Sequence, residues 1–479
     1  MQRNACQQNH MFVDRKRLVP RKGCLSETFI SAGNRQPNSL SQSGGKTMSM
    51  KAKLFRALLV LCSLLVMIGG ASAQDAITLQ FFYPVGVAGP LAQAIDSYVG
   101  EFNATHDHIQ VEPVFTGGYS ENMARATAAI LSGQPPDVAI LLGIDIYTLI
   151  QLEGIIPLDD YIASENGLDI DDFFDAFMAN NIADGQVWSI PWQRSTPILY
   201  YNKDAFAEVG LNPETPPATW DELIEAGKQL VVRDGDNVTR WGVEVPTSFW
   251  IFANFAIQAG QHIGSLGDDP CAVYLDTPEA IEALAFLRTL QEEGIMPDGA
   301  NAWGTAPADF IAGAAAMIYH STGSLSTLLA NSPFEVGTAF MPAGEAGYGA
   351  NVGGGNYYIM KDIAPERQDA AWEFIRWMVR PEQIGQWGID SGYVAPRNAA
   401  WEVDPLMSYA ADTPQASTAR YQLEYAVKEF PATYGGQEIQ VITTQAIEAV
   451  NTGEQSPEEA LAIAQERANE VLIQNGCEL

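Results

Sequence analysis

The side chains best suited to chemistry in this sequence are aromatic rings that occur beside small hydroxyl and amide groups in expected loops. Ring faces can stack on the C–H faces of a sugar, while hydroxyl and amide groups can pair with its hydroxyls. The aromatic candidates are Tyr83, Tyr119, Trp192, Trp250 and Tyr393, and the polar candidates are Ser195, Ser321, Ser324 and Asn356. Core packing is the alternative explanation for each aromatic residue. The combination predicts a site that binds a polyhydroxylated molecule.

Recognised catalytic and metal-binding patterns are sparse. The motifs G-x-x-x-x-G-K-[ST], H-E-x-x-H and G-x-S-x-G do not occur, so an ATPase is not expected on this chain. His106 and His108 have no cysteine nearby, and residues 234–237 lack the spacing of a calcium loop. The run Gly353–Gly355 precedes an expected strand, unlike a dinucleotide fingerprint. We expect no catalytic residue, no metal and no cofactor, although the many acidic residues leave a glycosidase carboxylate pair open.

The candidate residues fall in loops between elements that the hydrophobic pattern predicts. Strands are expected at residues 77–83, 109–115 and 137–142, and helices at residues 91–102 and 121–131. This alternation predicts an α/β lobe with a largely parallel sheet. In such sheets ligands bind at the carboxyl ends of strands, which places the loops at 83–84, 117–119 and 143–145 at the rim. Asp145 lies in the last of these loops.

A second organising segment spans residues 195–223. Residues 196–201 are rich in β-branched and aromatic residues, which predicts a strand. A short helix is expected over 204–209, ending at Gly210, because glycine tolerates the left-handed conformation found at helix ends. Thr219 and Glu222 have the spacing of a capping box and predict the start of another helix.

The N-terminal residues predict export. Residues 1–47 are polar and basic without periodicity, and we expect them to be a non-native extension. Residues 48–73 combine a basic flank, an apolar run over 57–68 and the small residues Ala71-Ser72-Ala73, which predicts a signal peptide cleaved after Ala73. The expected location is therefore periplasmic or extracellular.

The charge balance excludes some partners. The chain holds 26 Lys/Arg and 58 Asp/Glu, and residues 1–73 contain 11 and 2 of these, so the mature chain has 15 against 56 and a net charge of −41. Such a chain repels nucleic acid and anionic membranes. Two cysteines remain, Cys271 and Cys477. An oxidising compartment would allow them to pair, but the sequence leaves their proximity open.

Several segments resemble one protein family. The stretch STPILYYNKDAF (195–206), followed by Gly210-Leu211 and TWDEL (219–223), resembles the extracellular solute-binding proteins of family 1. These are the capture subunits of bacterial carbohydrate importers of the ATP-binding-cassette (ABC) type, and the stretch is most similar to the sn-glycerol-3-phosphate-binding branch. The segments IPW (190–192), FIAGAAAM (310–317) and SGYVAP (391–396) also resemble the family. The resemblance covers most of residues 77–474.

The resemblance implies the fold of a type II periplasmic binding protein, with two α/β lobes, a hinge and a ligand cleft between them. It implies lobe 1 at residues 74–185 plus about 318–370, and lobe 2 at 186–317 plus about 371–479. It also implies a non-catalytic monomer that closes around a sugar, polyol or glycerol phosphate and delivers it to membrane permease subunits.

The glycerol-3-phosphate branch can be carried over residue by residue. The positions that match its binding residues are Tyr119, Ser195, Trp250, Ser321, Ser324, Gly354 and Tyr393. Where that branch has a rim glutamate this sequence has Gly143, with Asp145 two residues on, and Ala432 stands where a late arginine is expected. Arginine binds phosphate through its bidentate fork, so its loss favours a neutral sugar, and Arg194 is the one substitute near the expected rim. The alternatives are sn-glycerol-3-phosphate binding, a secreted glycoside hydrolase, and an adhesin or scaffold.

Overall fold

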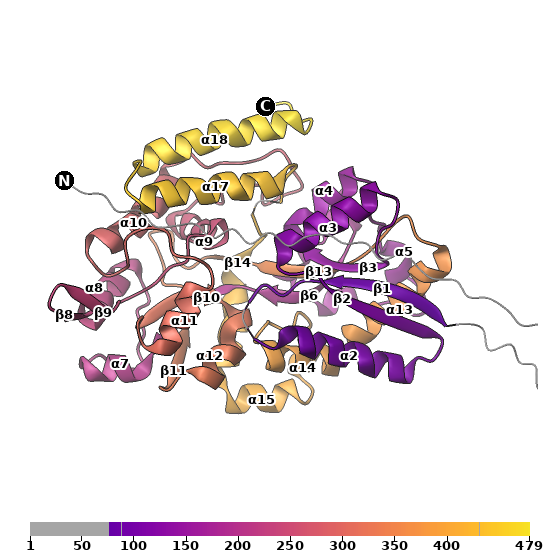
Figure 1. Ribbon diagram of the computed structural model, residues 1–479, viewed down its shortest axis with the longest axis horizontal. Helices are drawn as coiled ribbons and strands as arrows, with labels where there is room; N and C mark the ends of the chain where they lie inside the picture. Colours follow the sequence, from indigo (N-terminus) through magenta and orange to yellow (C-terminus); the bar gives the residue numbers. More distant parts are fainter. Residues whose placement is uncertain (1–75, 88, 431) are drawn as a thin grey trace, which may run out of the picture. The chain divides into compact units, whose positions relative to one another are not determined.

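The structure is a computed structural model that describes residues 76–87, 89–430 and 432–479 (Figure 1). The expected extension (1–47) and signal peptide (48–73) lie outside the described residues. The described residues form one compact unit. Within the described ranges, no helix combines the length and the apolar character needed to cross a membrane.

A five-stranded mixed sheet has the order β2-β1-β3-β13-β6. Its strands are β1 (Ile77–Tyr83), β2 (Ile109–Phe115), β3 (Val138–Leu142), β6 (Ile190–Ser195) and β13 (Gly353–Ile359). The first three strands run parallel, as the alternating pattern predicts, and β13 runs antiparallel to both of its neighbours. The returning strand β13 therefore brings a late segment of the chain between β3 and β6.

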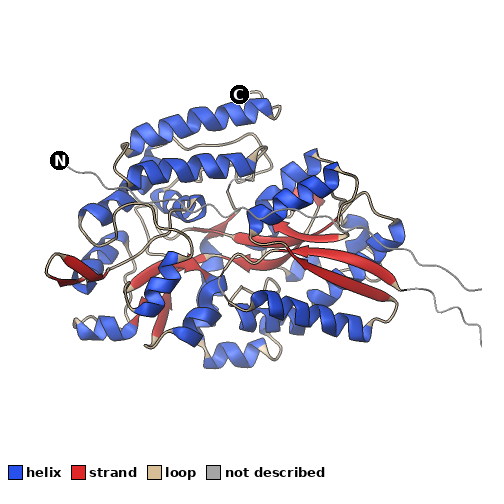
Figure 2. Ribbon diagram, viewed as in Figure 1, coloured by secondary structure: helices blue, strands red, loops and turns tan. Residues whose placement is uncertain are grey.

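Helices cover both faces of the five-stranded sheet (Figure 2). One face carries α2 (Leu91–Thr105), α13 (Pro365–Met378) and α14 (Pro381–Ser391), and the other carries α3 (Tyr119–Leu131) and α4 (Ile146–Gln151). The predicted face of α2 is confirmed, because Leu91, Ile95, Tyr98 and Phe102 are all buried. Smaller elements at this sheet are α5 (Asp159–Ile162), α6 (Asp175–Met178) and the hairpin of β4 (Ile182–Ala183) and β5 (Gln186–Val187).

A three-stranded antiparallel sheet has the order β10-β7-β11. Its strands are β7 (Pro197–Asn202), β10 (Met317–Ser321) and β11 (Val336–Ala339). The helices associated with it are α7 (Lys203–Glu208), α8 (Trp220–Leu230), α9 (Phe249–Ala259), α10 (Pro278–Glu292), α11 (Thr305–Ala312), α12 (Leu325–Asn331), α17 (Gly436–Asn451) and α18 (Pro457–Gln474). The last two lie side by side at the C-terminal end of the chain (Figure 1).

Short elements complete the described chain. They are the hairpin of β8 (Val232–Asp234) and β9 (Asn237–Arg240), the pair β12 (Ala350–Asn351) and β14 (Ala426–Val427), the helices α15 (Leu406–Asp412) and α16 (Thr418–Gln422), and the 3-10 turns η1 (Gly143–Asp145), η2 (Ile170–Asp172), η3 (Thr322–Ser324), η4 (Asn398–Trp401), η5 (Pro414–Ser417) and η6 (Leu423–Tyr425).

The helix starts follow the side-chain chemistry of the sequence. Thr219 accepts the amide of Glu222, as predicted, but the Glu222 carboxylate accepts the amide of Ala218 rather than that of Thr219. At α18 a capping box is complete, with Ser456 and Glu459 each accepting the other's amide.

The strand pairings depart from the expected lobe boundaries. β10 and β11, expected with the first lobe, pair with β7 in the three-stranded sheet. β6, expected with the second lobe, pairs with β13 in the five-stranded sheet, and α13 packs on that sheet as well. Which strand a segment pairs with depends on contacts far apart in sequence, so local hydrophobic periodicity does not reveal it.

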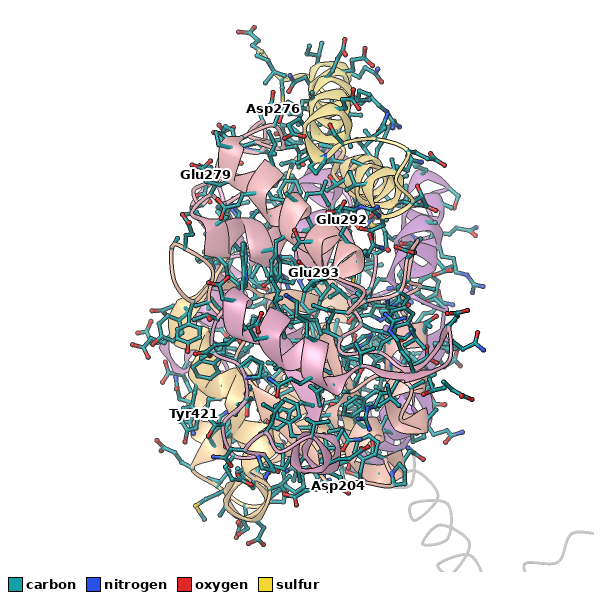
Figure 3. The ribbon with its side chains drawn as sticks, turned by 90° about the vertical axis from the view of Figure 1, so that its left-hand side faces the viewer. Asp204, Asp276, Glu279, Glu292, Glu293 and Tyr421 are labelled. Carbon is teal, nitrogen blue, oxygen red and sulfur yellow. A yellow bond between two sulfur atoms is a disulfide. The ribbon has the colours of Figure 1, made fainter. Side chains whose placement is uncertain are left out.

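The acidic composition is visible at the surface. Figure 3 labels Asp204, Asp276, Glu292 and Glu293, whose side chains are exposed on the face of the three-stranded sheet's helices. Carboxylates distributed in this way keep a protein soluble and repel other anions.

A disulfide joins Cys271 to Cys477 across 206 residues of sequence and ties the C-terminus to the loop before α10. A cross-link that closes a long loop restricts the unfolded chain. We predict that Cys271→Ser with Cys477→Ser lowers the free energy of unfolding by about 2–3 kcal/mol. Urea unfolding of both proteins without reductant measures the difference, and equal midpoints would contradict the prediction.

Candidate ligand-binding site

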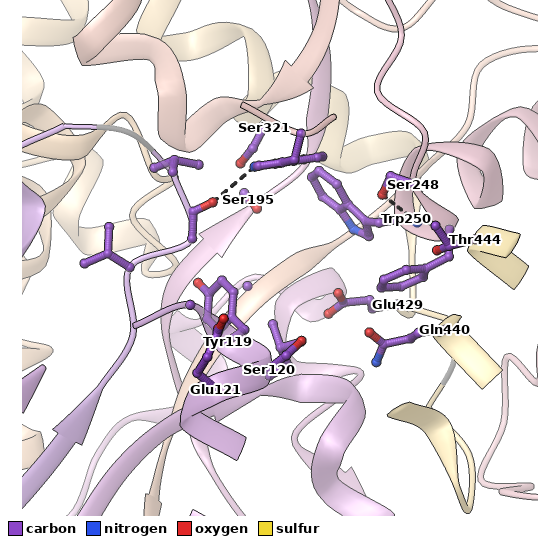
Figure 4. Close-up of a pocket in the computed structure, with 18 of the residues that line it drawn as sticks. Tyr119, Ser120, Glu121, Ser195, Ser248, Trp250, Ser321, Glu429, Gln440 and Thr444 are labelled. Atoms are coloured by element: carbon purple, nitrogen blue, oxygen red, sulfur yellow. Dashed lines mark hydrogen bonds between the residues drawn. The ribbon is translucent and has the colours of Figure 1, made fainter. Parts of the chain in front are cut away.

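A pocket of about 590 Å³ lies between residues of the two sheets (Figure 4). The five-stranded side contributes the loop after β1 (85–87), the start of α3 (118–121) and the ends of strands, including Leu142 and Gly354. The other side contributes residues 247–250 at the start of α9, with Trp303 and Ser321. The segment before α17 and that helix itself supply Glu429, Gln440 and Thr444. A concave space of this size suits a small-molecule ligand.

Half of the residues singled out from the sequence line this pocket. They are Tyr119, Ser195, Trp250, Ser321, Gly354 and Tyr393. All six are among the positions that the resemblance to the glycerol-3-phosphate branch predicts. Their side chains or backbones come from both sheets, which is the arrangement expected of a cleft.

The two tyrosines of the wall are held by the five-stranded sheet. The Tyr119 hydroxyl donates to Gln193 Oε1 at 3.1 Å and lies 3.3 Å from the Tyr393 hydroxyl. The Tyr119 ring lies so close to Gly86 that a Cβ atom there would come within 2.4 Å of it. The Tyr393 ring stacks on Trp387, which in turn stacks on Trp192. Because Trp192 lies behind this stack, it supports the wall without lining it.

The opposite wall consists of two tryptophans. Trp250 lies in the first turn of α9, two residues after the N-cap Ser248, and its indole N–H donates to the carbonyl of Val352 at 3.0 Å. The ring of Trp303 packs against that of Trp250 at an interplanar angle of 61°. Its indole N–H donates to the carbonyl of Gly86 at 3.1 Å and so links the three-stranded side to the loop after β1. Trp303 was not predicted from the sequence.

Three predicted residues have partners inside the protein and do not line the pocket. The Tyr83 hydroxyl donates to Asp96 in the core beside β1. Trp192 is fully buried among the aromatic rings of the five-stranded sheet. The Ser324 hydroxyl lies 2.8 Å from His320 Nδ1, since η3 turns that side chain away from the pocket. Sequence alone could not distinguish a buried aromatic or hydroxyl from one that faces the cleft.

The predicted cation Arg194 also lies behind the pocket wall. Its guanidinium is fully buried and donates to the carbonyl of Gly354 and to Asn356 Oδ1. Asn356 is therefore a partner of Arg194 rather than a lining residue. Asp145 is buried as well, and accepts from Gln437 of α17 at 2.7 Å and from the Leu142 amide. It joins the two sides of the cleft without facing it.

Carboxylates, which the sequence did not single out, reach the pocket wall. Glu121 lies in the first turn of α3, and Glu429 lies in the segment after β14. Asn180 holds the Glu429 backbone at both its amide and its carbonyl. Glu429 is buried, and Oε2 of its carboxyl group has no hydrogen-bond partner within the described part of the chain. Among the described residues that line the pocket, none is a lysine or an arginine.

Burial sets the protonation of two carboxyl groups near the pocket. It raises the pKa of Glu429 to about 8, although the nearby Arg194 lowers it, and it raises the pKa of Asp145 to about 7 against two hydrogen bonds. Removing a carboxylate from water disfavours its charged form. Both groups therefore tend to be protonated near neutral pH when the pocket holds no cation.

These raised pKa values predict a dependence of stability on pH. The folded values exceed those of the unfolded chain, so the stabilisation is complete below about pH 4 and is lost as the pH rises through 7 and 8. We expect the two carboxyl groups together to lower the free energy of unfolding by several kcal/mol, on the order of 7, between pH 5 and pH 9. Urea unfolding of the wild type and of Asp145→Asn with Glu429→Gln measures this cost, and an equal pH slope in both proteins would refute the prediction.

Comparison with known proteins places this geometry in a family. Residues 97–414 match the family described as bacterial extracellular solute-binding protein. The sn-glycerol-3-phosphate-binding periplasmic protein UgpB of Escherichia coli K12 is 28% identical over 420 residues, which cover 84% of this chain and 94% of that protein.

Solved structures resemble the chain over nearly their whole length. UgpB from Mycobacterium tuberculosis, in complex with glycerophosphocholine, has a TM-score of 0.73 at 24% identity, covering 83% of this chain and 98% of that one. The cyclic α-maltosyl-1,6-maltose binding protein of Arthrobacter globiformis has a TM-score of 0.69 at 25% identity, covering 83% and 100%. Maltose-bound T. maritima MalE3 has a TM-score of 0.71 at 21% identity, covering 82% and 99%.

Proposed function

The chain belongs to the bacterial extracellular solute-binding proteins, and from that premise we propose that it is the substrate-binding subunit of an ABC importer for a carbohydrate or polyol. The observation that carries this proposal is the composition of the pocket wall. Aromatic rings from Tyr119, Trp250 and Trp303 stand beside the hydroxyls of Ser195 and Ser321. Flat apolar faces beside paired polar groups suit a sugar ring.

The lobes follow the two sheets. We assign residues 76–195 and about 353–398 to lobe 1, and residues 197–339 and 436–479 to lobe 2. The connection from β6 to β7 passes between the sheets at Thr196. Closure would bring the walls together around the solute, because the walls belong to different lobes. Bonds such as Trp303 to Gly86 and Gln437 to Asp145 already join the two sides.

The predominant alternative is a phosphorylated ligand, which the names of the curated relatives favour. A buried phosphate needs a cationic partner, and arginine provides the strongest geometry for one. Here the nearby cation, Arg194, is turned toward the Gly354 carbonyl and Asn356, while Glu121 and Glu429 lie in the wall. We therefore propose a carbohydrate or polyol without a phosphate group.

The proposal includes export and transport without catalysis. The protein acts outside the cytoplasmic membrane after cleavage behind Ala73, as a monomer, and passes its ligand to permease subunits. Mass spectrometry of the exported protein measures its N-terminus, for which we expect Gln74. Incubation with oligosaccharides should release no new reducing ends, and turnover would instead support a glycoside hydrolase.

Small-angle X-ray scattering with and without a panel of sugars and polyols tests capture by closure. We expect at least one solute to reduce the radius of gyration and to raise the melting temperature, because a ligand that binds only the folded state stabilises it. A chain that neither compacts nor gains thermal stability with any member of the panel would count against the proposal.

A further inference from the structure

Carboxyl groups line the pocket without a cation beside them in the described lining. Glu121 and Glu429 line it, and the described lining residues include neither lysine nor arginine. Arg194, the cation whose charge lowers the pKa of Glu429, donates to a carbonyl and to an amide oxygen, and the ion pairs of the described residues do not include one between Arg194 and Glu429. Arg194 therefore attracts the Glu429 carboxylate without donating to it.

Glu429 is positioned to accept a hydrogen bond from a ligand. Only 3% of the residue is exposed, and its backbone is fixed by two hydrogen bonds with Asn180, which donates to the Glu429 carbonyl and accepts from the Glu429 amide. Figure 4 shows its carboxyl group directed toward the space between Tyr119 and Trp250. Its Oε2 atom is enclosed and has no hydrogen-bond partner among the described residues. A ligand therefore meets this carboxyl group from the pocket side, where Glu429 lines the wall, and a donor supplied there offsets part of the cost of its burial.

We propose, on the basis of the proposed function, that the ligand is a sugar or polyol bearing a protonated amino group, which binds to Glu429. An ammonium group brings both hydrogen-bond donors for the Glu429 carboxyl group and the positive charge that the described lining residues lack. A hydroxyl brings a donor without the charge.

The surrounding rings favour the same group. A cation over the face of an aromatic ring is attracted by the ring's quadrupole, most strongly for tryptophan. Trp250 and Tyr119 stand on two sides of the space that Glu429 faces (Figure 4). The net charge of −32 over the whole sequence also raises the local concentration of cations around the protein. The pocket thus offers an amino group both the Glu429 carboxyl group, as acceptor and counter-charge, and the ring faces of Trp250 and Tyr119.

Matched pairs of ligands provide the test. Calorimetry of the chain from Gln74 to Leu479 would compare glucosamine with glucose, galactosamine with galactose, and the β-1,4-linked glucosamine disaccharide with cellobiose. In the pair that fits, we expect the amino member to bind at least about tenfold more tightly, and we expect Glu429→Gln to remove that advantage. The matched control is Glu438→Gln, which removes an exposed carboxylate from the first turn of α17 and should retain the advantage.

The outcomes separate this inference from the proposed function. Equal or tighter binding of the hydroxyl member in every pair that binds would overturn the inference and leave sugar capture intact. An amino advantage that persists in Glu429→Gln would also overturn it. The comparison within wild-type pairs does not depend on the folding of any variant. Failure of every member of every pair to bind would count against carbohydrate capture itself.

Discussion

Replacement of Trp250 by alanine is expected to weaken carbohydrate binding by roughly 100-fold, because the indole forms one wall of the pocket. The ring packs on Gly353, where a Cβ atom would come within 2.7 Å of it, and its N–H donates to the Val352 carbonyl. Its removal leaves both a gap in the wall and an unpaired buried carbonyl. Calorimetry with the solute identified by scattering measures the loss.

Trp401 offers a matched control for this substitution. It is as buried as Trp250, at 7% exposure, and its indole donates to the Ala395 carbonyl at the same distance of 3.0 Å, but it does not line the pocket. Trp401→Ala should lower the free energy of unfolding by about 3 kcal/mol while the remaining folded protein keeps its affinity. If Trp250→Ala and Trp401→Ala changed the affinity equally, the proposal that Trp250 contacts the ligand as part of the pocket wall would be wrong.

Replacement of Gly354 by alanine is expected to destabilise the protein by about 4 kcal/mol and to abolish binding. Gly354 has φ +97°, and an added Cβ atom would lie 1.8 Å from the carbonyl oxygen of Gln193 on the paired strand β6. The strands would have to separate where Gly354 lines the pocket and its carbonyl accepts from Arg194. Urea unfolding and calorimetry together measure the two losses.

Gly299→Ala is a control that measures the cost of a positive φ without the steric clash that Gly354→Ala creates. Its φ of +88° is similar, but a Cβ atom there would meet no heavy atom within 4 Å. Gly299→Ala should therefore cost only about 1 kcal/mol and leave binding unchanged. Comparable losses for the two glycine variants would show that the approach of β6 is not what requires Gly354.

Local patterns predicted the elements of the fold that local chemistry determines. The strand over 196–201 and the buried face of α2 follow from side-chain types and spacing alone. The cap at Thr219 follows from the preference of a hydroxyl for free amides. The pairing of Cys271 with Cys477 stayed open, because 206 residues separate two cysteines that only the tertiary structure brings together.

The residues that sequence reasoning missed depend on long-range contacts. Glu429 reaches the pocket because Asn180 fixes its backbone from a distant part of the chain, and Trp303 does so through the Gly86 carbonyl. Neither has a motif that distinguishes it from a surface acid or a core tryptophan. Conversely, Tyr83 ends β1 and Asp145 follows β3 at the expected rim, but both side chains are buried, with Asp96 and Gln437 as their hydrogen-bond partners.

The most direct test of capture is a calorimetric titration of the chain from Gln74 to Leu479. The panel holds maltose-type sugars, amino sugars, glycerol and glycerol-3-phosphate. We predict that a sugar or polyol binds with one molecule per chain and that glycerol-3-phosphate does not bind, because carboxylates rather than cations line the pocket. Tight binding of glycerol-3-phosphate, with no binding of any sugar or polyol, would contradict this account.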